Sequence, residues 1–319
     1  MKAVWFESFG SAADTLVFGE QPKPDAGPGE VLVKLATTGV NPSDVKKRAG
    51  AFPKLLDDGL VIPHSDGAGV IEAVGTGVDP GRVGERVFVY QAQYGRRLGT
   101  AAEYVALDSR CAPRLPDNTS FEVGACIGIP VMTAHRCVFA DGPVDGQTIV
   151  VTGGAGRVGY YAIQWAKWAG ARVIATASNA EDEATCRALG ADHVVNHRQE
   201  DWGNALLACT GGDKVHRVVD VEFGANLPEV LKFIGTGGTI ATYSSTVVKE
   251  PKLPFIQMMF MDLTVRMVIV YAMPEEAKAQ AIADTCQLLE ADQLQHRIAH
   301  CLPFEQMVKS HELIEQGGF

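Results

Sequence analysis

The sequence of 319 residues lacks the features that define several large classes of protein. Its longest apolar run near the C-terminal end, residues 267–273, is far shorter than the roughly 20 residues of a membrane span. Its 28 Lys and Arg residues are outnumbered by 38 Asp and Glu residues, and the net charge of -10 argues against a nucleic-acid-binding surface. Residues 1–7 lack the apolar core of a signal peptide, because an acid follows at Glu7. We therefore expect a soluble, cytoplasmic protein that binds neither nucleic acid nor a membrane.

Cysteines are few and unpaired in pattern. The seven cysteines are scattered and form no C-x-x-C pair, which predicts reduced thiols rather than a disulfide framework or a zinc knuckle. The hydrophobic fraction of 46% is ample for packed interiors, and the length predicts two domains.

One glycine-rich stretch is the strongest signal in the chain. The β-branched run 149–151 leads into glycines at 154, 156 and 159, and a helical pattern and a second buried strand, residues 172–177, follow. Glycines at this spacing let the backbone approach a diphosphate, whose charge then lies at a helix N-terminus. The predicted cofactor contacts of this turn are Gly154, Ala155, Gly156, Arg157, Val158 and Gly159.

The pattern of the elements changes near Ser120. Before it, short strands at 31–35, 69–74, 86–90 and 101–107 lie between Gly/Pro turns and predict a partly closed barrel.

After Ser120, helices at 121–127 and 131–139, separated by Pro130, precede an alternation of strands and helices that predicts a parallel sheet. The expected strands are 149–152, 173–177, 193–196, 218–221, 238–243 and 264–270. A helix at 274–291, a strand at 295–301 and a helix at 304–315 are expected to close the chain.

Four motifs occur in order at characteristic spacings: Gly-Val-Asn-Pro-Ser-Asp at 39–44, the Pro-His-Ser-Asp-Gly-Ala-Gly stretch at 63–69, residues 128–134, and the glycine turn at 153–159. With them the chain resembles the medium-chain dehydrogenase/reductase superfamily and, within it, the zinc-independent, zeta-crystallin-like quinone oxidoreductases. The resemblance extends over nearly the whole chain.

The resemblance implies an α/β fold in which a GroES-like β-barrel catalytic domain carries an inserted Rossmann domain with a doubly wound parallel sheet. The expected boundaries are 1–120 for the catalytic domain, 121–262 for the NADP-binding domain and 263–319 for the return to the catalytic domain. It further implies an active site in the cleft and a homodimer built by pairing the last strands of two nucleotide domains. Relatives usually continue past residues 316–318 into a further strand, so we expect either a missing strand or a truncated C-terminus.

The zinc ligands of the alcohol-dehydrogenase branch have no counterparts by this alignment. Asn41 and Ser65 stand where a cysteine and a histidine would be, and Ile129 holds the place of the last ligand. An amide, a hydroxyl and an alkyl side chain are poor or useless zinc donors. His64 is one position away from the ligand position, and His296 and His300 are expected on a strand, too far apart to chelate. We expect no metal.

The cofactor prediction rests on the end of the second strand. An acid there typically binds the ribose hydroxyls of NAD, but Ala177 holds its place. Ser178 and Asn179 are therefore the candidates to receive a 2′-phosphate, which favours NADPH, whereas Asp182 stands where NADP-binding relatives often have a lysine, so NADH stays an alternative.

By resemblance alone, the remaining cofactor contacts are Thr133, His197, Tyr243 and Ser244, with His197 expected beside the adenosine. A solvated loop histidine is the alternative for His197.

The catalytic candidates lie in the first motif. Asn41 is expected to hydrogen-bond the substrate oxygen or the cofactor, and Asp44 either to act in the site or to cap a helix. Lys46 either donates a hydrogen bond to a developing phenolate or is a solvated helix lysine. Without a metal, a quinone or enone is the favoured substrate, because conjugation delocalises the charge that forms on hydride addition.

The leading hypothesis is a zinc-independent, NADPH-dependent quinone oxidoreductase. The alternatives are an NADPH-dependent alkenal or enone double-bond reductase, a non-catalytic nucleotide-binding protein of the crystallin kind, and a zinc alcohol dehydrogenase.

Overall fold

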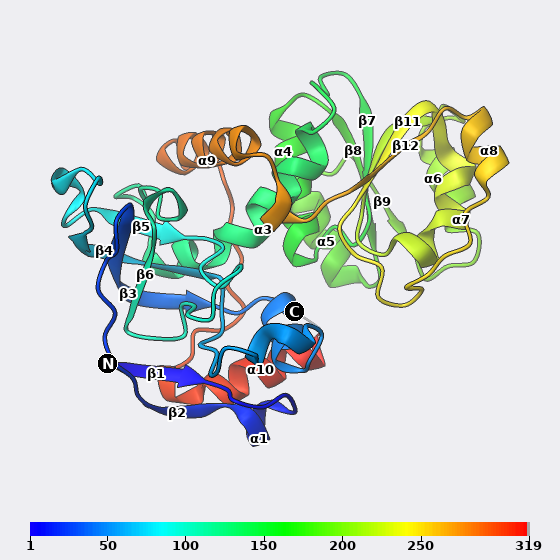
Figure 1. The fold of residues 1–319 in the computed structure, drawn as a ribbon. Coiled ribbons are helices and arrows are strands. Elements are labelled where there is room, and N and C mark those ends of the chain that lie inside the picture. The colour runs from blue at the N-terminus through cyan, green and yellow to red at the C-terminus, as the bar shows by residue number, and fades with distance from the viewer. Residues whose placement is uncertain (318–319) are drawn as a thin grey trace. The chain divides into compact units, whose positions relative to one another are not determined.

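The computed structural model describes residues 1–317 and divides into two compact units (Figure 1). Unit 1 comprises residues 1–129 together with the chain from Ile282 onward, and unit 2 is Pro130–Ala281. The first division falls inside a single helix, α3 (Phe121–Phe139), whereas the sequence placed a boundary before it, at 120. The second division also lies later than the expected 262. Among the described residues, no helix is both long and apolar enough to span a membrane.

Unit 1 is built on a four-stranded antiparallel sheet in the order β5-β4-β3-β6. Its strands, close to the predicted positions, are β3 (Glu30–Gly39), β4 (Asp66–Val74), β5 (Arg86–Val89) and β6 (Tyr104–Asp108). Alternating side chains of these strands form one buried cluster, and residues between them, such as Leu32 and Phe88, are buried on the other face. The buried set includes Val31, Val33, Ile71, Val87, Val105 and Leu107.

A second cluster of elements in unit 1 joins the two ends of the chain. The elements are β1 (Lys2–Trp5), α1 (Ala12–Thr15), β2 (Val17–Glu20), α2 (Pro42–Arg48) and α10 (Met307–Gln316). β1 and β2 pair antiparallel, and Met307 of α10 is buried against Ala3 and Val4 of β1. The last helix is therefore part of the N-terminal core.

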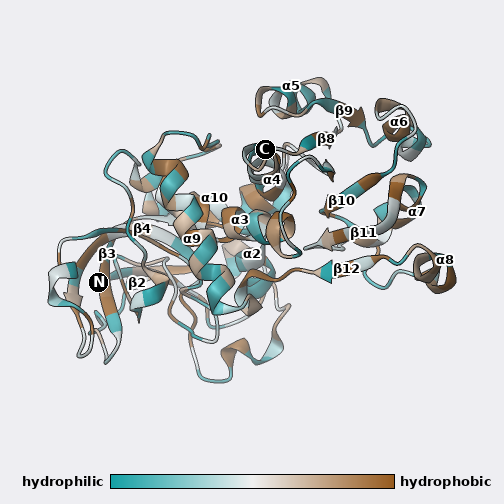
Figure 2. Ribbon diagram, turned by 90° about the horizontal axis from the view of Figure 1, so that it is seen from above, coloured by the Kyte–Doolittle hydropathy of each residue, from teal (hydrophilic) through white to brown (hydrophobic). Residues whose placement is uncertain are grey.

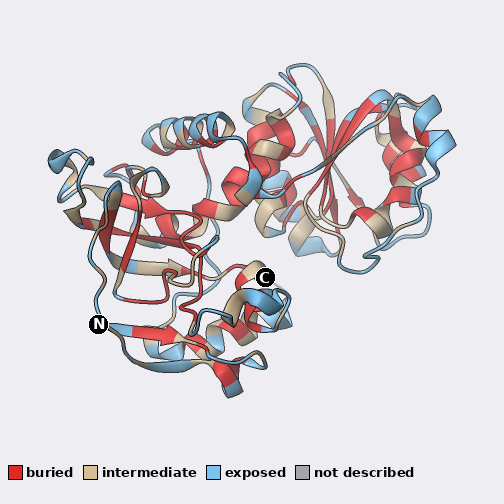
Figure 3. Cartoon of the chain, viewed as in Figure 1, coloured by how far each residue is buried: buried red, intermediate tan, exposed pale blue. Residues whose placement is uncertain are grey.

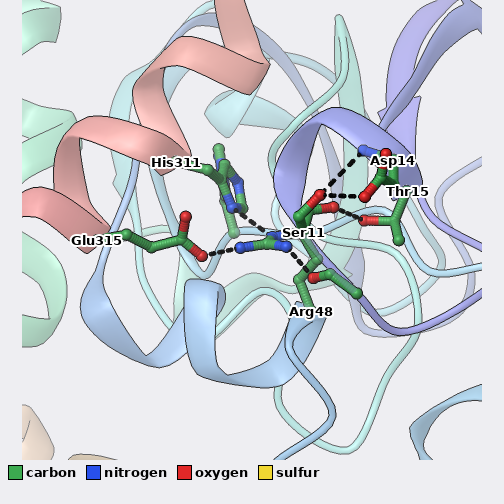
Figure 4. A network of polar contacts seen from close by, with 8 residues as sticks. Ser11, Asp14, Thr15, Arg48, His311 and Glu315 are labelled. Atoms are coloured by element: carbon green, nitrogen blue, oxygen red, sulfur yellow. Dashed lines mark hydrogen bonds and ion pairs between the residues drawn. The ribbon is translucent and has the colours of Figure 1, made fainter.

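Arg48 connects α2 to α10 through a buried polar contact (Figure 4). Its guanidinium forms an ion pair with Glu315 and donates to the backbone oxygen of Gly10. Its Nε donates to Nδ1 of His311 at 3.4 Å. Because Nδ1 of His311 accepts, the proton of this imidazole lies on Nε2.

The hydrogen bonds continue from His311 in one direction. Nε2 of His311 lies 2.9 Å from Nε2 of His64, and Nδ1 of His64 lies 2.9 Å from Oγ1 of Thr38. Oγ1 of Thr38 lies 2.7 Å from Oγ1 of Thr100, which donates to the backbone oxygen of Asp66 at 2.5 Å. Each group therefore donates to the next, which requires both imidazoles to be neutral. Burial lowers the pKa of His311 to about 3 and that of His64 well below its ordinary value.

Unit 2 is a doubly wound parallel sheet, as predicted. Its strands lie in the order β12-β11-β10-β7-β8-β9, with helices on both faces (Figure 1). The strands are buried in the middle of the layers (Figure 3). They are β7 (Thr148–Val151), β8 (Arg172–Ala177), β9 (His193–Asn196), β10 (Val215–Asp220), β11 (Ile234–Thr242) and β12 (Thr264–Met267). The helices are α4 (Arg157–Trp168), α5 (Ala180–Ala188), α6 (Trp202–Cys209), α7 (Phe223–Phe233), α8 (Phe255–Phe260) and α9 (Glu275–Glu290), the last of which begins in unit 2 and ends in unit 1.

Two predictions of local structure were wrong. The expected strand at 295–301 has no regular secondary structure, and most of its residues are exposed, so it contributes no apolar face to a sheet. Pro130 does not separate two helices, because α3 runs through it without a break. A proline inside a helix removes one donor and crowds the preceding turn, at about 3 kcal/mol, and the burial of Val131 and Met132 beyond it offsets this cost. The expectation about the C-terminus concerns residues 318–319, which lie outside the described part.

We predict that His311→Leu destabilises the protein by about 2 kcal/mol or more at pH 7.5, because Arg48 and His64 each lose a buried partner. Since the folded pKa of His311 is below its unfolded value, its contribution is complete above pH 6.5 and is lost as the pH falls toward 3. The deficit of the variant should therefore narrow by about 2 kcal/mol between pH 7 and pH 5 in urea denaturation. A constant deficit would contradict this account, and His300→Gln, on the exposed segment, is the control.

Candidate functional site

The first candidate site, in unit 1, forms where β3 ends and α2 begins. Asn41 precedes α2, and Pro42 occupies the first turn, where a missing N–H costs nothing. The N–H of Asn41 donates to Oδ2 of Asp44 at 2.8 Å. The structure thus brings Asn41 and Asp44 together, with Asp44 closing the first turn of the helix and also lying buried in the cluster.

Asp66, at the start of β4, is the acid on which this cluster converges. Its Oδ2 accepts from Nδ2 of Asn41 and from the N–H of Ile129, each at 2.9 Å. Its Oδ1 has no hydrogen-bond partner among the described residues. Gly128 makes this approach possible, because a Cβ there would lie 2.3 Å from Oδ1 of Asp66. Burial raises the pKa of Asp66 to about 7, so the carboxyl holds a proton near neutral pH.

A lysine completes the cluster. Nζ of Lys47 donates to both oxygens of Gln93, to Oε1 at 2.7 Å and to the backbone oxygen at 3.1 Å. Burial lowers the pKa of Lys47, and burial also raises that of Asp44 to about 6. The neighbouring Lys46 is exposed on the other side of α2, so its proposed role at the substrate stays a prediction.

The donors around Asn41 do not fit a zinc ion. Nδ2 of Asn41 already donates to Asp66, and Ile129 approaches with its backbone N–H, which repels a cation. Nε2 of His64 is turned to His311 rather than to this cluster. In the described chain, no three His, Cys, Asp or Glu side chains are grouped to hold a metal. None of the cysteines in residues 1–317 forms a disulfide.

A second candidate site, in unit 2, is the glycine turn between β7 and α4. The turn is fixed to β8, because the N–H of Gly153 donates to Oγ1 of Thr176 at 3.0 Å and that of Gly154 to the backbone oxygen of Thr176 at 2.9 Å. Gly156 is the N-cap of α4 and provides no side chain to cap it. The positive end of a twelve-residue helix therefore faces the turn.

The glycines of the turn differ in what a side chain would meet. A Cβ on Gly159 would lie 2.3 Å from the backbone oxygen of Gly153, and one on Gly154 would lie 2.8 Å from Sγ of Cys186. Gly156 is exposed, and a Cβ there would meet only the oxygen of Gly153 at 3.1 Å. Gly154 and Gly159 are thus required by packing, whereas Gly156 leaves space on the outside of the turn, as an approaching diphosphate needs.

The other predicted cofactor residues follow the carboxyl ends of the parallel strands, which meet at one edge of the sheet. Ser178 and Asn179 follow β8, His197 follows β9, and Tyr243 and Ser244 follow β11. Burial lowers the pKa of His197 and raises that of Tyr243 well above its ordinary value. The remaining predicted contacts belong to the turn and α4, namely Ala155, Arg157 and Val158, and to α3, where Thr133 is buried.

Asp220 stabilises this edge of the sheet through hydrogen bonds to neighbouring elements. Its Oδ1 accepts from Oγ1 of Thr152 and from Nδ2 of Asn226, each at 2.7 Å. Glu222 accepts from three consecutive N–H groups, of Thr246, Val247 and Val248, and so fixes the loop that follows Ser244.

Sequence reasoning had passed over several of these groups. Asp66 lies inside the motif at 63–69, whose residues indicate the family but do not single out this acid. Lys47 lies three residues after Asp44, a spacing that puts both on one helix face and signals the pair. The hydrogen bonds to Thr176 and Asp220 carry no local signal, because their partners lie 23 and 68 residues away.

Comparison with known proteins agrees with this architecture. The family described as alcohol dehydrogenase GroES-like domain matches residues 27–117, and that described as zinc-binding dehydrogenase matches residues 158–285. Quinone oxidoreductase of Homo sapiens is 28% identical over all of this chain and 95% of its own length. That of Mus musculus is 32% identical over 75% of this chain and 72% of its own. The mycobacterial Rv1454c, solved in complex with NADPH, has a TM-score of 0.87 and 26% identity over 99% of this chain and 97% of that one.

A GroES-like unit joined to a doubly wound sheet with a glycine turn defines a two-domain dehydrogenase or reductase. The chain belongs to the quinone oxidoreductase branch of the medium-chain dehydrogenase/reductase superfamily, a branch of oxidoreductase enzymes. The expected α/β fold class is confirmed.

We predict that Asp66→Asn gains stability relative to the natural chain as the pH rises. The folded pKa of Asp66 is raised, so its contribution is present at low pH and is lost as the pH rises through about 7. Asparagine does not titrate. Between pH 6 and 8 the free energy of unfolding of the variant should therefore rise by about 1 kcal/mol relative to that of the natural chain. Denaturation curves at the two pH values measure this. The exposed control Asp58→Asn should show no such change, and an equal shift in both variants would refute the assignment.

Proposed function

We propose that the protein is an NADPH-dependent quinone oxidoreductase that works without zinc. The observation that carries the proposal is the pairing, in one chain, of an open glycine turn at a helix N-terminus with an Asn41–Asp66 cluster whose donors do not fit a metal. The quinone oxidoreductase relatives and the NADPH complex of a structural neighbour support it.

The residues of unit 2 fit a dinucleotide. In this proposal the N–H groups of the glycine turn bind the diphosphate, Ser178 and Asn179 bind at the adenosine ribose, and Tyr243 and Ser244 lie beside the nicotinamide ribose. His197 flanks the adenosine, and Thr133 on α3 contacts the cofactor. When bound, NADPH supplies the hydride.

Asn41 is the proposed group that orients the substrate. Its Nδ2 donates to Asp66, and the same side chain also lies beside the carboxyl of Asp44, so in this proposal a substrate oxygen takes the place of one of these acids at the amide. The quinone gains the hydride and one proton from water, so the products are the hydroquinone and NADP⁺. The carboxylate of Asp44 accepts from the backbone N–H of Asn41 and so keeps Asn41 in position. A conjugated acceptor suits this site, because an amide is a weaker electrophile than a metal ion.

We further propose a cytoplasmic homodimer. β12 is an edge strand of the parallel sheet, and its Met267 is 75% exposed. The nearby α8 is hydrophobic in Figure 2 and exposed in Figure 3, with Phe260 78% exposed. An exposed edge next to apolar side chains is a typical dimer interface, and sedimentation of the purified chain measures its mass.

The test of the function is oxidation of NADPH by purified protein, followed at 340 nm with benzoquinone and with phenanthrenequinone. We expect turnover of both and no dependence on added zinc. Asn41→Ala should lower kcat/KM by about tenfold or more, because one oriented donor is lost. The matched variant Lys46→Ala tests the exposed lysine, and an equal loss there would give it a catalytic role.

Three results would replace the proposal. Rapid reduction of 2-alkenals without quinone turnover would indicate an enone reductase, and cofactor binding without any turnover would indicate a non-catalytic protein. Stoichiometric zinc in unsupplemented protein would indicate an alcohol dehydrogenase.

The glycine turn gives a separate prediction. Gly156→Ala should keep the fold, with a loss of stability of about 1 kcal/mol or less, yet weaken NADPH binding about tenfold, because the methyl group stands on the open side of the turn. Gly159→Ala should instead destabilise unit 2 by about 1–3 kcal/mol, because the turn must move. Thermal melting and NADPH fluorescence titration distinguish the two. Unchanged NADPH binding by Gly156→Ala would place the diphosphate elsewhere.

A further inference from the structure

The two residues expected to receive a 2′-phosphate are already bound to an acid. Nδ2 of Asn179 donates to Oδ2 of Asp182 at 2.8 Å, and Oγ of Ser178 donates to the same oxygen at 3.5 Å. In return, Oδ1 of Asn179 accepts from the N–H of Asp182 at 2.9 Å, so that Asn179 caps α5. One carboxylate oxygen therefore receives donors from both candidates.

Asp182 lies in the first turn of α5, the helix that directly follows strand β8. β7 leads into the glycine turn, and β8 is the next strand of the sheet and pairs with it. In doubly wound sheets the adenosine ribose lies at the end of the strand in the position of β8. Ala177 ends β8 without a charge, and Asp182 restores a carboxylate in the first turn of α5. The acid thus reaches the ribose side from the helix rather than from the strand.

A carboxylate at this place acts differently on the two cofactors. It can accept a hydrogen bond from a ribose hydroxyl, but it repels a 2′-phosphate and occupies the donors that such a phosphate needs. Its field extends to the next strand, since Asp182 raises the pKa of His197, against the stronger lowering by burial and by Arg198.

We propose that Asp182 is a specificity-determining residue that disfavours the 2′-phosphate and lets NADH compete with NADPH. This inference rests on the proposed function only in that a nicotinamide dinucleotide binds at the glycine turn. In this proposal the charge of Asp182 sets how strongly the protein prefers one cofactor over the other.

The test is Asp182→Asn in the full chain, which keeps an oxygen to accept from Asn179 and removes the charge. Calorimetric titration with adenosine 2′,5′-bisphosphate and with 5′-AMP compares a ligand that has the 2′-phosphate with one that lacks it. We expect the Kd for the bisphosphate to fall about five- to tenfold, while that for 5′-AMP changes by less than about twofold. The gain should shrink at high salt, because this carboxylate is partly exposed. The ratio of kcat/KM for NADPH over NADH should rise by the same factor.

The control is Glu181→Gln, which removes the same charge one residue away from an exposed side chain. It should change neither Kd. An equal gain in this control, an equal shift for both ligands, or no shift in Asp182→Asn would overturn the inference.

Failure of the proposed function would look different. If both ligands behave as expected but no quinone is reduced, Asp182 keeps its role and the quinone reductase assignment fails. If neither ligand binds to a folded protein, dinucleotide binding fails and this inference fails with it.

Discussion

The arrangement of unit 1 depends on how one buried carboxyl is accommodated. Asp66 lies at the meeting point of β4, the start of α2 and the middle of α3, and it has two donors, one from Asn41 and one from the backbone of Ile129. Two hydrogen bonds do not offset the loss of solvent around a full charge, so the group responds by binding a proton near neutral pH. Gly128 is the packing consequence, since any larger residue would collide with the acid. Helix, strand and loop are thus positioned around a single side chain.

The same reasoning bears on the proposal that this cluster works without a metal. A cation is one way to balance the charge of a buried carboxylate, and the raised pKa of Asp66 together with the donor from Asn41 is another. The amide that approaches Asp66 is the group proposed to orient the substrate. An Asn41 side chain fixed by Asp66 loses less rotamer entropy when it binds a second acceptor, so the buried acid contributes to preorganisation.

The hydrogen bonds from Arg48 to Thr100 add a second constraint on unit 1. His64 adopts a left-handed backbone conformation, with φ at 75°, which is unfavourable for a side chain with a Cβ. Its imidazole compensates by binding Thr38 and His311, and His311 in turn binds Arg48. Because every donor in this series is used in one direction, one protonated histidine would leave two donors facing each other. The C-terminal helix is consequently attached to the first strands by a contact that requires neutral imidazoles.

What the sequence predicted and what it missed follow from the range of the interactions. The parallel sheet, the glycine turn and α9 are encoded by periodicity over a few residues, and they were predicted close to their positions. The strand expected at 295–301 failed because a strand needs a partner, and sequence pattern does not show whether one is available. Pro130 was a wrong signal for a helix end, because its cost of about 3 kcal/mol is offset by the packing of the buried residues beyond it. His311 could not be paired with His64 at all, since 247 residues separate them.

Burial also separates the two acids that matter most for the proposed reaction. Asp66 is buried, and the loss of solvent around its carboxyl is the main cause of its raised pKa. It therefore binds a proton more readily than an exposed aspartate does. Asp182 is partly exposed in the first turn of α5, where its carboxylate accepts from Asn179 and Ser178. A phosphate that approaches this carboxylate meets a like charge and competes for the same two donors. The local interactions that begin α5 are therefore the same ones that oppose a 2′-phosphate, and a preference between two cofactors can follow from how a helix is capped.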